Sequence, residues 1–309
     1  MAGKPPLIVI LGPTAVGKTS LAIDIARNLD GEIVSADSRQ IYRHMDIGTA
    51  KPTPEEQEAA THRLIDIVAP EENLSLAQYQ RRAYSAIDQL HQQGKVPLLV
   101  GGTGQYITAL VEGWSIPEVP PNERLRSELE TYAEEHGASA LHQRLSHRDP
   151  VAADKIHPNN IRRVVRALEV CIETDTPISE LQRKKPPPYA IRQYGLQMER
   201  EALYQRADRR VDNMMEAGLL DEVRGLLARG YPASLPAMSS IGYRQLAEHL
   251  RGEISLDEAV ETTKYATHDF IRRQYTWFRG HDDGIIWLDA ATLRPKQVIE
   301  DIYQWLKER

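Results

Sequence analysis

The sequence predicts an α/β protein: a P-loop type parallel sheet flanked by helices, with an all-helical insertion domain. Three observations indicate this class. An apolar run leads directly into a glycine-rich loop and an amphipathic segment; strand-like and helix-like segments alternate over the first third; and helices then follow between two proline-rich stretches. We therefore expect the first part of the core at residues 1–115, the insertion at 116–190 and the second part of the core at 191–309.

The first predicted strand, at residues 7–11, leads into a loop that is suited to hold phosphate. The loop consists of Gly12, Pro13, Thr14, Ala15, Val16, Gly17, Lys18 and Thr19, and a helix with apolar positions from 21 to 29 follows. Its glycines let backbone amides point inward, and the positive end of the helix favours an anion. We expect Lys18 to neutralise a terminal phosphate and the Thr19 hydroxyl to hold Mg²⁺. The loop therefore predicts a site for a phosphorylated ligand.

The remaining elements complete a sheet whose strand ends converge. Further strands are predicted at 33–36, 64–68, 96–100, 194–197 and 285–288, with helices at 76–90 and 295–307. Ligands of open parallel sheets bind beyond the carboxyl ends of the strands, so Asp37, Thr103 and the phosphate loop should line one crevice. Asp37 is a candidate to accept a proton from a nucleophile or to bind the metal; alternatively, it caps the next helix.

The end of the strand at 96–100 argues against a nucleotide-hydrolysing motor. Such proteins usually carry an aspartate there to hold magnesium through water, whereas this strand ends in Gly101-Gly102-Thr103-Gly104. Asp66, within the segment 64–68, is a substitute candidate for that role.

The composition is typical of a globular protein, with 41% hydrophobic and 27% charged residues and a net charge of −6. No apolar run approaches the roughly 20 residues that span a bilayer, and no charged-then-apolar leader opens the chain, so we expect a cytoplasmic protein without membrane contact. The single cysteine, Cys171, lies in an apolar periodic segment, which predicts a core thiol and excludes internal disulfides and cysteine zinc clusters.

Two basic clusters stand out against the acidic whole. The first contains Lys155, Arg162, Arg163 and Arg166 without an acid; the second contains Lys264, Arg272, Arg273 and Arg279 with one acid, Asp269. Helical spacing places five residues of the segment 262–281 on one face: Lys264, His268, Arg272, Tyr275 and Arg279. Basic side chains interleaved with aromatic ones suit a nucleic-acid backbone with unpaired bases. A solvated basic face with its aromatics in the core fits the composition equally well.

Six motifs, in this order along nearly the whole chain, resemble those of the bacterial tRNA dimethylallyltransferases, also called tRNA isopentenyltransferases. They are residues 12–19, Ser35-Ala36-Asp37-Ser38-Arg39-Gln40-Ile41-Tyr42, Gly101-Gly102-Thr103-Gly104, Arg166-Ala167-Leu168-Glu169, Ile241-Gly242-Tyr243-Arg244 and Arg273-Gln274-Tyr275-Thr276-Trp277. The resemblance implies transfer of a dimethylallyl group from dimethylallyl diphosphate to N6 of the adenine 3′ of the anticodon, with release of diphosphate.

The resemblance also implies roles for individual residues. Asp37 would act as the base and Thr103 would position the adenine, while Lys18, Mg²⁺ at Thr19, with Asp37 as a second metal candidate, and Arg224 would hold the diphosphate. A surface salt bridge is the alternative for Arg224. The anticodon stem-loop of tRNA would contact Asp37, Ser38, Arg39, Gln40, Thr103, Arg162, Arg163, Arg166, Ile241, Gly242, Tyr243, Arg244, Arg272, Arg273, Gln274, Tyr275, Trp277 and Arg279. We expect a monomer.

Three other functions use parts of the same pattern. A P-loop small-molecule kinase would use Lys18 and Thr19 on ATP, and would transfer or hydrolyse its terminal phosphate. An adenylate prenyltransferase would act on free AMP and would not need the basic face at 264–279. A non-catalytic RNA-binding protein would leave Asp37 unexplained.

Overall fold

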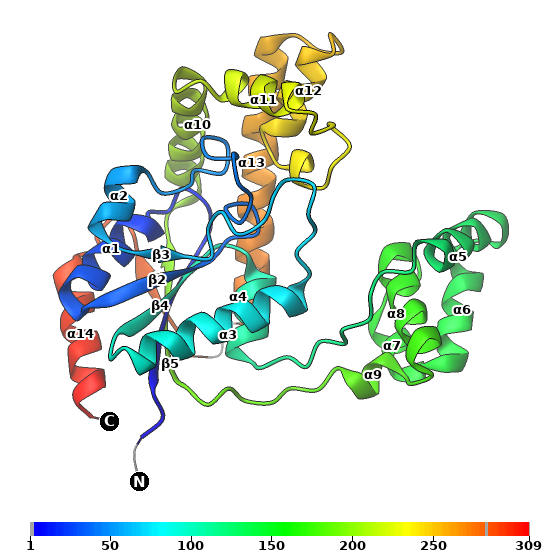
Figure 1. The fold of residues 1–309 in the computed structure, drawn as a ribbon, viewed down its shortest axis with the longest axis horizontal. Coiled ribbons are helices and arrows are strands. Elements are labelled where there is room, and N and C mark those ends of the chain that lie inside the picture. Colours follow the sequence, from blue (N-terminus) through cyan, green and yellow to red (C-terminus); the bar gives the residue numbers. More distant parts are fainter. Residues whose placement is uncertain (1–2, 282–283, 309) are drawn as a thin grey trace. The chain divides into compact units, whose positions relative to one another are not determined.

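The structure, a computed structural model, describes residues 3–281 and 284–308 (Figure 1). The chain divides into two compact units, one formed by Met1–Val111 with Pro188–Arg309 and the other by Glu112–Pro187. The ends of the second unit lie a few residues before those expected for the insertion. Its two connectors pair with each other, because the backbone N–H of Lys185 donates to Gly113 O (2.8 Å).

The first unit is built on a six-stranded sheet with the strand order β3-β2-β4-β1-β5-β6. All neighbouring strands are parallel, which confirms the predicted class. The strands are β1 Pro6–Leu11, β2 Gly31–Ala36, β3 His62–Arg63, β4 Val96–Gly101, β5 Ala190–Gln197 and β6 Ile285–Asp289. Most of β1, β2 and β4 is fully buried, as expected of strands covered on both faces.

The strand predicted at 64–68 is wrong. β3 ends at Arg63, and the apolar residues after it form an irregular segment. Leu64 and Asp66 have φ values of 63° and 55°, which no strand adopts. Val68 forms an isolated bridge to Tyr42, and the backbone N–H groups of Asp66 and Ile67 donate to Gln40 O (3.1 Å) and Ile41 O (2.8 Å).

Helices cover both faces of the sheet. On one face, α1 Lys18–Leu29 and α14 Pro295–Lys307 pack against residues such as Ile8, Ile10 and Leu98. On the other face, α3 Leu76–Gln92 and α4 Gly104–Val111 pack against Leu7, Val9 and Leu99. The alternation along β1 therefore fills two cores at once. A short helix, α2 Pro54–Ala59, follows the loop after β2.

Helices after β5 form a third core within the first unit (Figure 1). They are α10 Arg200–Glu216, α11 Leu219–Ala228, the 3₁₀ turn η1 Ala237–Ser239, α12 Tyr243–Leu250 and α13 Leu256–Arg279. The apolar residues Ile41, Tyr42 and Met45, which follow β2, join this third core. The end of α13 reaches the sheet, because Ile271 and Phe278 belong to the cores on its two faces.

The second unit is helical and has a core of its own. It contains α5 Glu123–His136, α6 Ala138–Arg148, α7 Pro150–Lys155, α8 Ile161–Thr174 and α9 Ile178–Leu181. Cys171 lies in this core, and burial raises the pKa of its thiol, as predicted for a core residue. Among the described residues of the whole chain, no helix has the length and apolar character that crossing a bilayer requires.

Candidate active site

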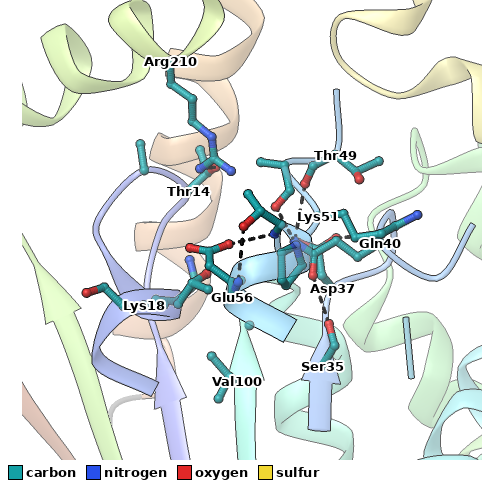
Figure 2. A pocket seen from close by; sticks show the side chains of 18 of the residues that line it. Thr14, Lys18, Ser35, Asp37, Gln40, Thr49, Lys51, Glu56, Val100 and Arg210 are labelled. Atoms are coloured by element: carbon teal, nitrogen blue, oxygen red, sulfur yellow. Dashed lines mark hydrogen bonds between the residues drawn. The ribbon is translucent and has the colours of Figure 1, made fainter. Parts of the chain in front are cut away.

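A cavity of about 960 Å³ lies beyond the carboxyl ends of β1, β2 and β4. The phosphate loop lines it through Thr14, Lys18 and Thr19, and the end of β2 contributes Asp37 (Figure 2). Arg210 enters from α10. The crevice that the sheet topology predicts is therefore present, and it brings cationic groups and a carboxylate together.

The phosphate loop needs both of its glycines. Gly12 and Gly17 have φ values of 147° and 105°, in the region that side chains rarely adopt. A Cβ on Gly12 would also lie 2.6 Å from the carbonyl oxygen of Leu196. The loop folds back on itself, because Lys18 Nζ donates to Pro13 O (2.7 Å). The ammonium group is thereby held inside the loop where a phosphate would sit.

The protein by itself supports the charge of Lys18 only weakly. Burial lowers the pKa of Lys18 to about 7; the negative charge of Asp37 raises it, and Arg210 lowers it further. An anionic ligand would supply the missing counter-charge. A cation whose charge depends on its ligand in this way is typical of a functional anion site.

Three arginines of α10 line the cavity but are absent from the site that the sequence predicts: Arg206, Arg209 and Arg210. Arg210 Nη1 donates to Thr14 Oγ1 (3.4 Å). Burial lowers the pKa of the Arg210 guanidinium. The guanidinium of Arg206 lies 3.7 Å from the place of a Cβ on Gly17. Arg206 and Arg210 are four residues apart and therefore lie on one face of α10. Acidic residues next to them in the sequence make this pair of arginines hard to recognise as a basic site.

Arg224, the arginine expected to hold the diphosphate, lies elsewhere in the structure. It belongs to α11, its side chain is 56% exposed, and it pairs with Asp221 one turn before it. It is not among the residues that line the cavity. Arg210 occupies the position that the additional arginine requires, because α10 rather than α11 is the helix that reaches the phosphate loop.

Asp37 faces the cavity and also shapes the chain after it. Its Oδ1 accepts the backbone N–H groups of Arg39 (2.8 Å) and Gln40 (3.3 Å). The segment it caps is a turn and not the helix that the capping alternative assumed. Thr103 lies behind it: Ser38 N donates to Thr103 Oγ1 (3.0 Å), and Thr103 N donates to Ala36 O (3.2 Å). The ends of β2 and β4 are thus joined on either side of Asp37.

The loop at 46–53 forms another wall of the cavity. Buried Lys51 donates to Tyr42 O (2.8 Å) and pairs with Asp46 and Asp66. Glu222 of α11 accepts the backbone N–H groups of three successive loop residues, Asp46, Ile47 and Gly48. Asp66 is therefore engaged by an ammonium group, which disfavours the magnesium role considered for it.

The face of α13 that carries the second basic cluster is largely an internal contact. Lys264 Nζ pairs with Asp212 (2.8 Å), and His268 Nε2 lies 2.7 Å from Asp208 Oδ1. Both acids belong to α10, so helical spacing identifies a common face correctly but not its packing partner. Arg272 pairs with Asp269 on the same helix and is 58% exposed, and Arg273 is exposed as well.

Three predicted RNA contacts on α13 are engaged within the fold. Gln274 is buried and bonds the phosphate loop; the Tyr275 hydroxyl receives the N–H of Met198 (3.1 Å); and Trp277 Nε1 donates to Thr108 Oγ1 (2.9 Å). These three side chains are therefore hydrogen-bonded within the protein. Arg279 is exposed and lies 5.5 Å from the Tyr275 ring.

The turn before α12 is likewise mostly internal. Gly242 is buried with a φ of 89°, and the fully buried Tyr243 donates its hydroxyl hydrogen to Glu222. Ile241 is half-buried, and Arg244 is the exposed charge of the turn, with Glu248 nearby. Burial excludes the Tyr243 side chain from direct RNA contact.

The arginines of α8 divide into two kinds. Arg162 and Arg163 are exposed. Arg166 instead pairs with the fully buried Glu169, as does Arg126 of α5. Burial alone would raise the pKa of Glu169, but the hydrogen bonds of both arginines outweigh it and lower the pKa. Arg166 thus stabilises the insertion, and its predicted contact with RNA would compete with this internal ion pair.

Comparisons with known proteins agree on one family. The family profile described as IPP transferase matches residues 40–281. A tRNA dimethylallyltransferase from Roseiflexus castenholzii is 55% identical over 89% of this chain and 90% of its own length. One from Dehalococcoides mccartyi is 51% identical over 98% of this chain and 93% of its own.

Solved structures resemble the whole chain. The tRNA isopentenylpyrophosphate transferase of Bacillus halodurans is 41% identical, with a TM-score of 0.72 over 99% of this chain and 96% of that one. A eukaryotic dimethylallyltransferase described as acting on tRNA is 28% identical, with a TM-score of 0.86 over 99% of this chain and 80% of that one.

Proposed function

Because the chain belongs to the IPP transferase family, we propose that it transfers a dimethylallyl group from dimethylallyl diphosphate to N6 of the adenine 3′ of the anticodon in tRNA. Diphosphate is the other product. The observation that carries this proposal is that a phosphate loop with Lys18, together with Arg210, lines the same cavity as the carboxylate of Asp37. Such a site can hold a charged leaving group on one side and accept a proton on the other.

The donor side of the cavity stabilises the leaving group. As the allylic carbon–oxygen bond breaks, its electron pair moves to the diphosphate oxygen. Lys18 and Arg210, which line the cavity, are expected to hold that growing charge more strongly than they hold the intact donor. The low pKa of Lys18 supports this role, because the diphosphate would restore its proton.

The proposed metal is Mg²⁺ at the Thr19 hydroxyl, where it would neutralise diphosphate charge. The described residues hold no group of three or more His, Cys, Asp or Glu side chains arranged to bind a metal. This agrees with Mg²⁺, which usually takes one or two protein ligands and completes its shell with phosphate oxygens and water. Thr19 lines the cavity beside Lys18 and fits that requirement. Asp37, which lines the same cavity, is the proposed second ligand of the metal.

On the acceptor side, the adenine N6 forms the new bond to the allylic carbon and loses one proton. Asp37 is the proposed acceptor of that proton, and Thr103 the proposed hydrogen-bond partner of the adenine. A base that is normally stacked must leave the stack to reach them, at a cost of a few kcal/mol. The arginines proposed to hold the anticodon stem-loop are the exposed Arg162, Arg163, Arg244, Arg272, Arg273 and Arg279, together with Arg39, which is half-buried and donates to Pro236 O (3.0 Å). We expect a cytoplasmic monomer.

The test is transfer of radiolabelled dimethylallyl from its diphosphate to tRNA by the purified protein with Mg²⁺. Label in tRNA with an adenine at the target position, and none with guanine there, is the expected result. Equal labelling of free AMP would favour an adenylate prenyltransferase, and transfer of the terminal phosphate of ATP would favour a kinase.

The role of Asp37 is tested with Asp37→Asn. This variant keeps an oxygen for the amides of Arg39 and Gln40 but loses the basic carboxylate. We expect turnover to fall by about 10² or more with tRNA affinity nearly unchanged, as loss of a general base predicts. An equal loss of tRNA binding would move Asp37 to a recognition role.

A further inference from the structure

One buried amide connects the donor and acceptor sides of the cavity. Gln274 of α13 is 5% exposed. Its Oε1 accepts the backbone N–H of Thr14 in the phosphate loop (2.9 Å), and its Nε2 donates to Gly102 O at the end of β4 (2.8 Å). One partner is a donor and the other an acceptor, so a primary amide in one orientation satisfies both.

The packing around Gln274 leaves little freedom to shift. A Cβ on Gly102 would lie 2.4 Å from Gln274 Nε2, so the amide occupies the space beside that glycine. Three residues further along α13, Trp277 fills the corresponding space beside Gly104, where a Cβ would lie 2.2 Å from its ring. One face of α13 therefore holds the residues on both sides of Thr103.

Thr103 connects this packed region to Asp37, the proposed catalytic base. Its oxygen receives the N–H of Ser38, and its own N–H donates to Ala36 O, on the two sides of Asp37. A continuous path of hydrogen bonds and peptide units thus runs from the phosphate loop through Gln274 and Thr103 to the Asp37 turn.

We propose that Gln274 is a positioning residue that sets the separation between the diphosphate and the adenine nitrogen. The inference rests on the proposed function and extends it to a residue of the cavity wall whose amide is bonded within the protein. The reacting atoms must approach to about 3–3.5 Å, and a displacement of about 1 Å can cost 10²-fold in rate. Without the amide, the loop and the end of β4 lose the side chain that spans them.

The experiment compares Gln274→Met with Gln80→Met. Methionine matches glutamine in length and removes both hydrogen bonds. Gln80 provides the control, because it lies on α3 and its amide donates to Ala109 O (2.8 Å) away from the cavity. For Gln274→Met we expect kcat to fall by at least about tenfold and the affinity for inorganic diphosphate to fall several-fold. The KM for tRNA should stay within about twofold. Gln80→Met should keep the wild-type kcat at matched folded fraction.

A second variant separates positioning from folding. Gln274→Glu retains an acceptor for Thr14 but loses the donor to Gly102 when its new carboxyl is ionised. Its kcat, divided by that of the wild type at the same pH, should rise as the pH is lowered, because the protonated carboxyl can donate again. Gln274→Met should show no such rise.

Two results would overturn the inference: wild-type kcat and diphosphate affinity in folded Gln274→Met, or an equal loss in Gln80→Met. A wild-type protein that binds diphosphate but does not modify tRNA would instead refute the proposed function. In that case the diphosphate measurement still decides whether Gln274 supports the loop.

Discussion

At the scale of single residues, the site depends on charges whose neighbours are supplied by distant parts of the chain. The phosphate loop is local in sequence, and its motif identifies Lys18 and Thr19 directly. Arg210 enters from a helix almost two hundred residues later, and local spacing does not reveal which arginine will reach the loop. Arg224 illustrates this: it lies in a recognisable segment, yet its side chain is exposed, pairs with Asp221 and does not line the cavity.

Arg210 and Arg224 therefore form a matched pair for mutation. Arg210→Met removes a half-buried cation beside Thr14, so we expect the affinity for inorganic diphosphate to fall about tenfold to a hundredfold, the usual value of a hydrogen bond to a charged group. Arg224→Met removes an exposed pair and should change it by less than about twofold. Calorimetric titration measures both; the reverse order would restore Arg224 to the site.

The pKa of Lys18 predicts proton uptake when diphosphate binds. The folded protein holds this proton only below about pH 7, whereas the unfolded chain holds it up to about 10.5. The free energy of unfolding should therefore rise with pH between these values, because the unfolded state binds more protons there. Bound diphosphate restores the charge, so binding near pH 8.5 should take up about one proton more than at pH 6.

Calorimetry in buffers of different ionisation enthalpy measures that uptake. Lys18→Arg is the control, because arginine stays charged and should bind diphosphate without the extra proton. Equal uptake by the two proteins would assign the proton to another group.

At the scale of elements, periodicity predicts which residues share a face but not what that face contacts. Apolar runs correctly locate β1, β2 and β4, because strands buried on both faces are apolar throughout. β5 and β6 also lie where the sequence predicts them, although both are only partly buried. The run at 64–68 is equally apolar, yet positive φ values at Leu64 and Asp66 bend the chain there. The basic face of α13 is real, but α10 supplies acids that no local pattern on α13 could reveal.

The two kinds of basic residue on α13 should behave differently in RNA binding. We expect Arg272→Ala with Arg273→Ala to reduce the slope of log affinity against log salt by about one unit for each phosphate that the variant no longer neutralises. Lys264→Ala should lower thermal stability and leave the slope unchanged, because its ammonium is already paired with Asp212. Filter binding of tRNA at several salt concentrations distinguishes them, and equal slopes for all variants would exclude this helix from the RNA interface.

At the scale of the whole molecule, the chain contains two hydrophobic bodies that are stabilised separately. The sheet unit has cores on both faces, whereas the insertion depends on its own apolar cluster and on the buried Glu169. Prolines and the change in periodicity reveal that division in the sequence. They do not reveal that Arg166 is needed inside the insertion, because the partner Arg126 lies on another helix.

Glu169→Gln should destabilise the insertion alone. The two arginines lose a shared carboxylate, and because they are about one-third exposed we expect about 2 kcal/mol, between the values for exposed and buried pairs. Hydrogen exchange should accelerate in α5 and α8 and remain unchanged in β1 and β4. Glu128→Gln, on an exposed pair of α5, is the control and should alter neither. Faster exchange throughout the sheet would contradict separate stabilisation.

The paired connectors have a consequence for the evolution of such chains. The polypeptide leaves the sheet unit at Val111 and returns at Pro188, and the hydrogen bond between Lys185 and Gly113 brings the outgoing and returning segments together. An insertion whose two ends lie together can be lengthened, exchanged or shortened to a turn without changing the pairing of any strand in the sheet. Related enzymes can thus differ in this helical insertion while they keep the same active site in the sheet unit.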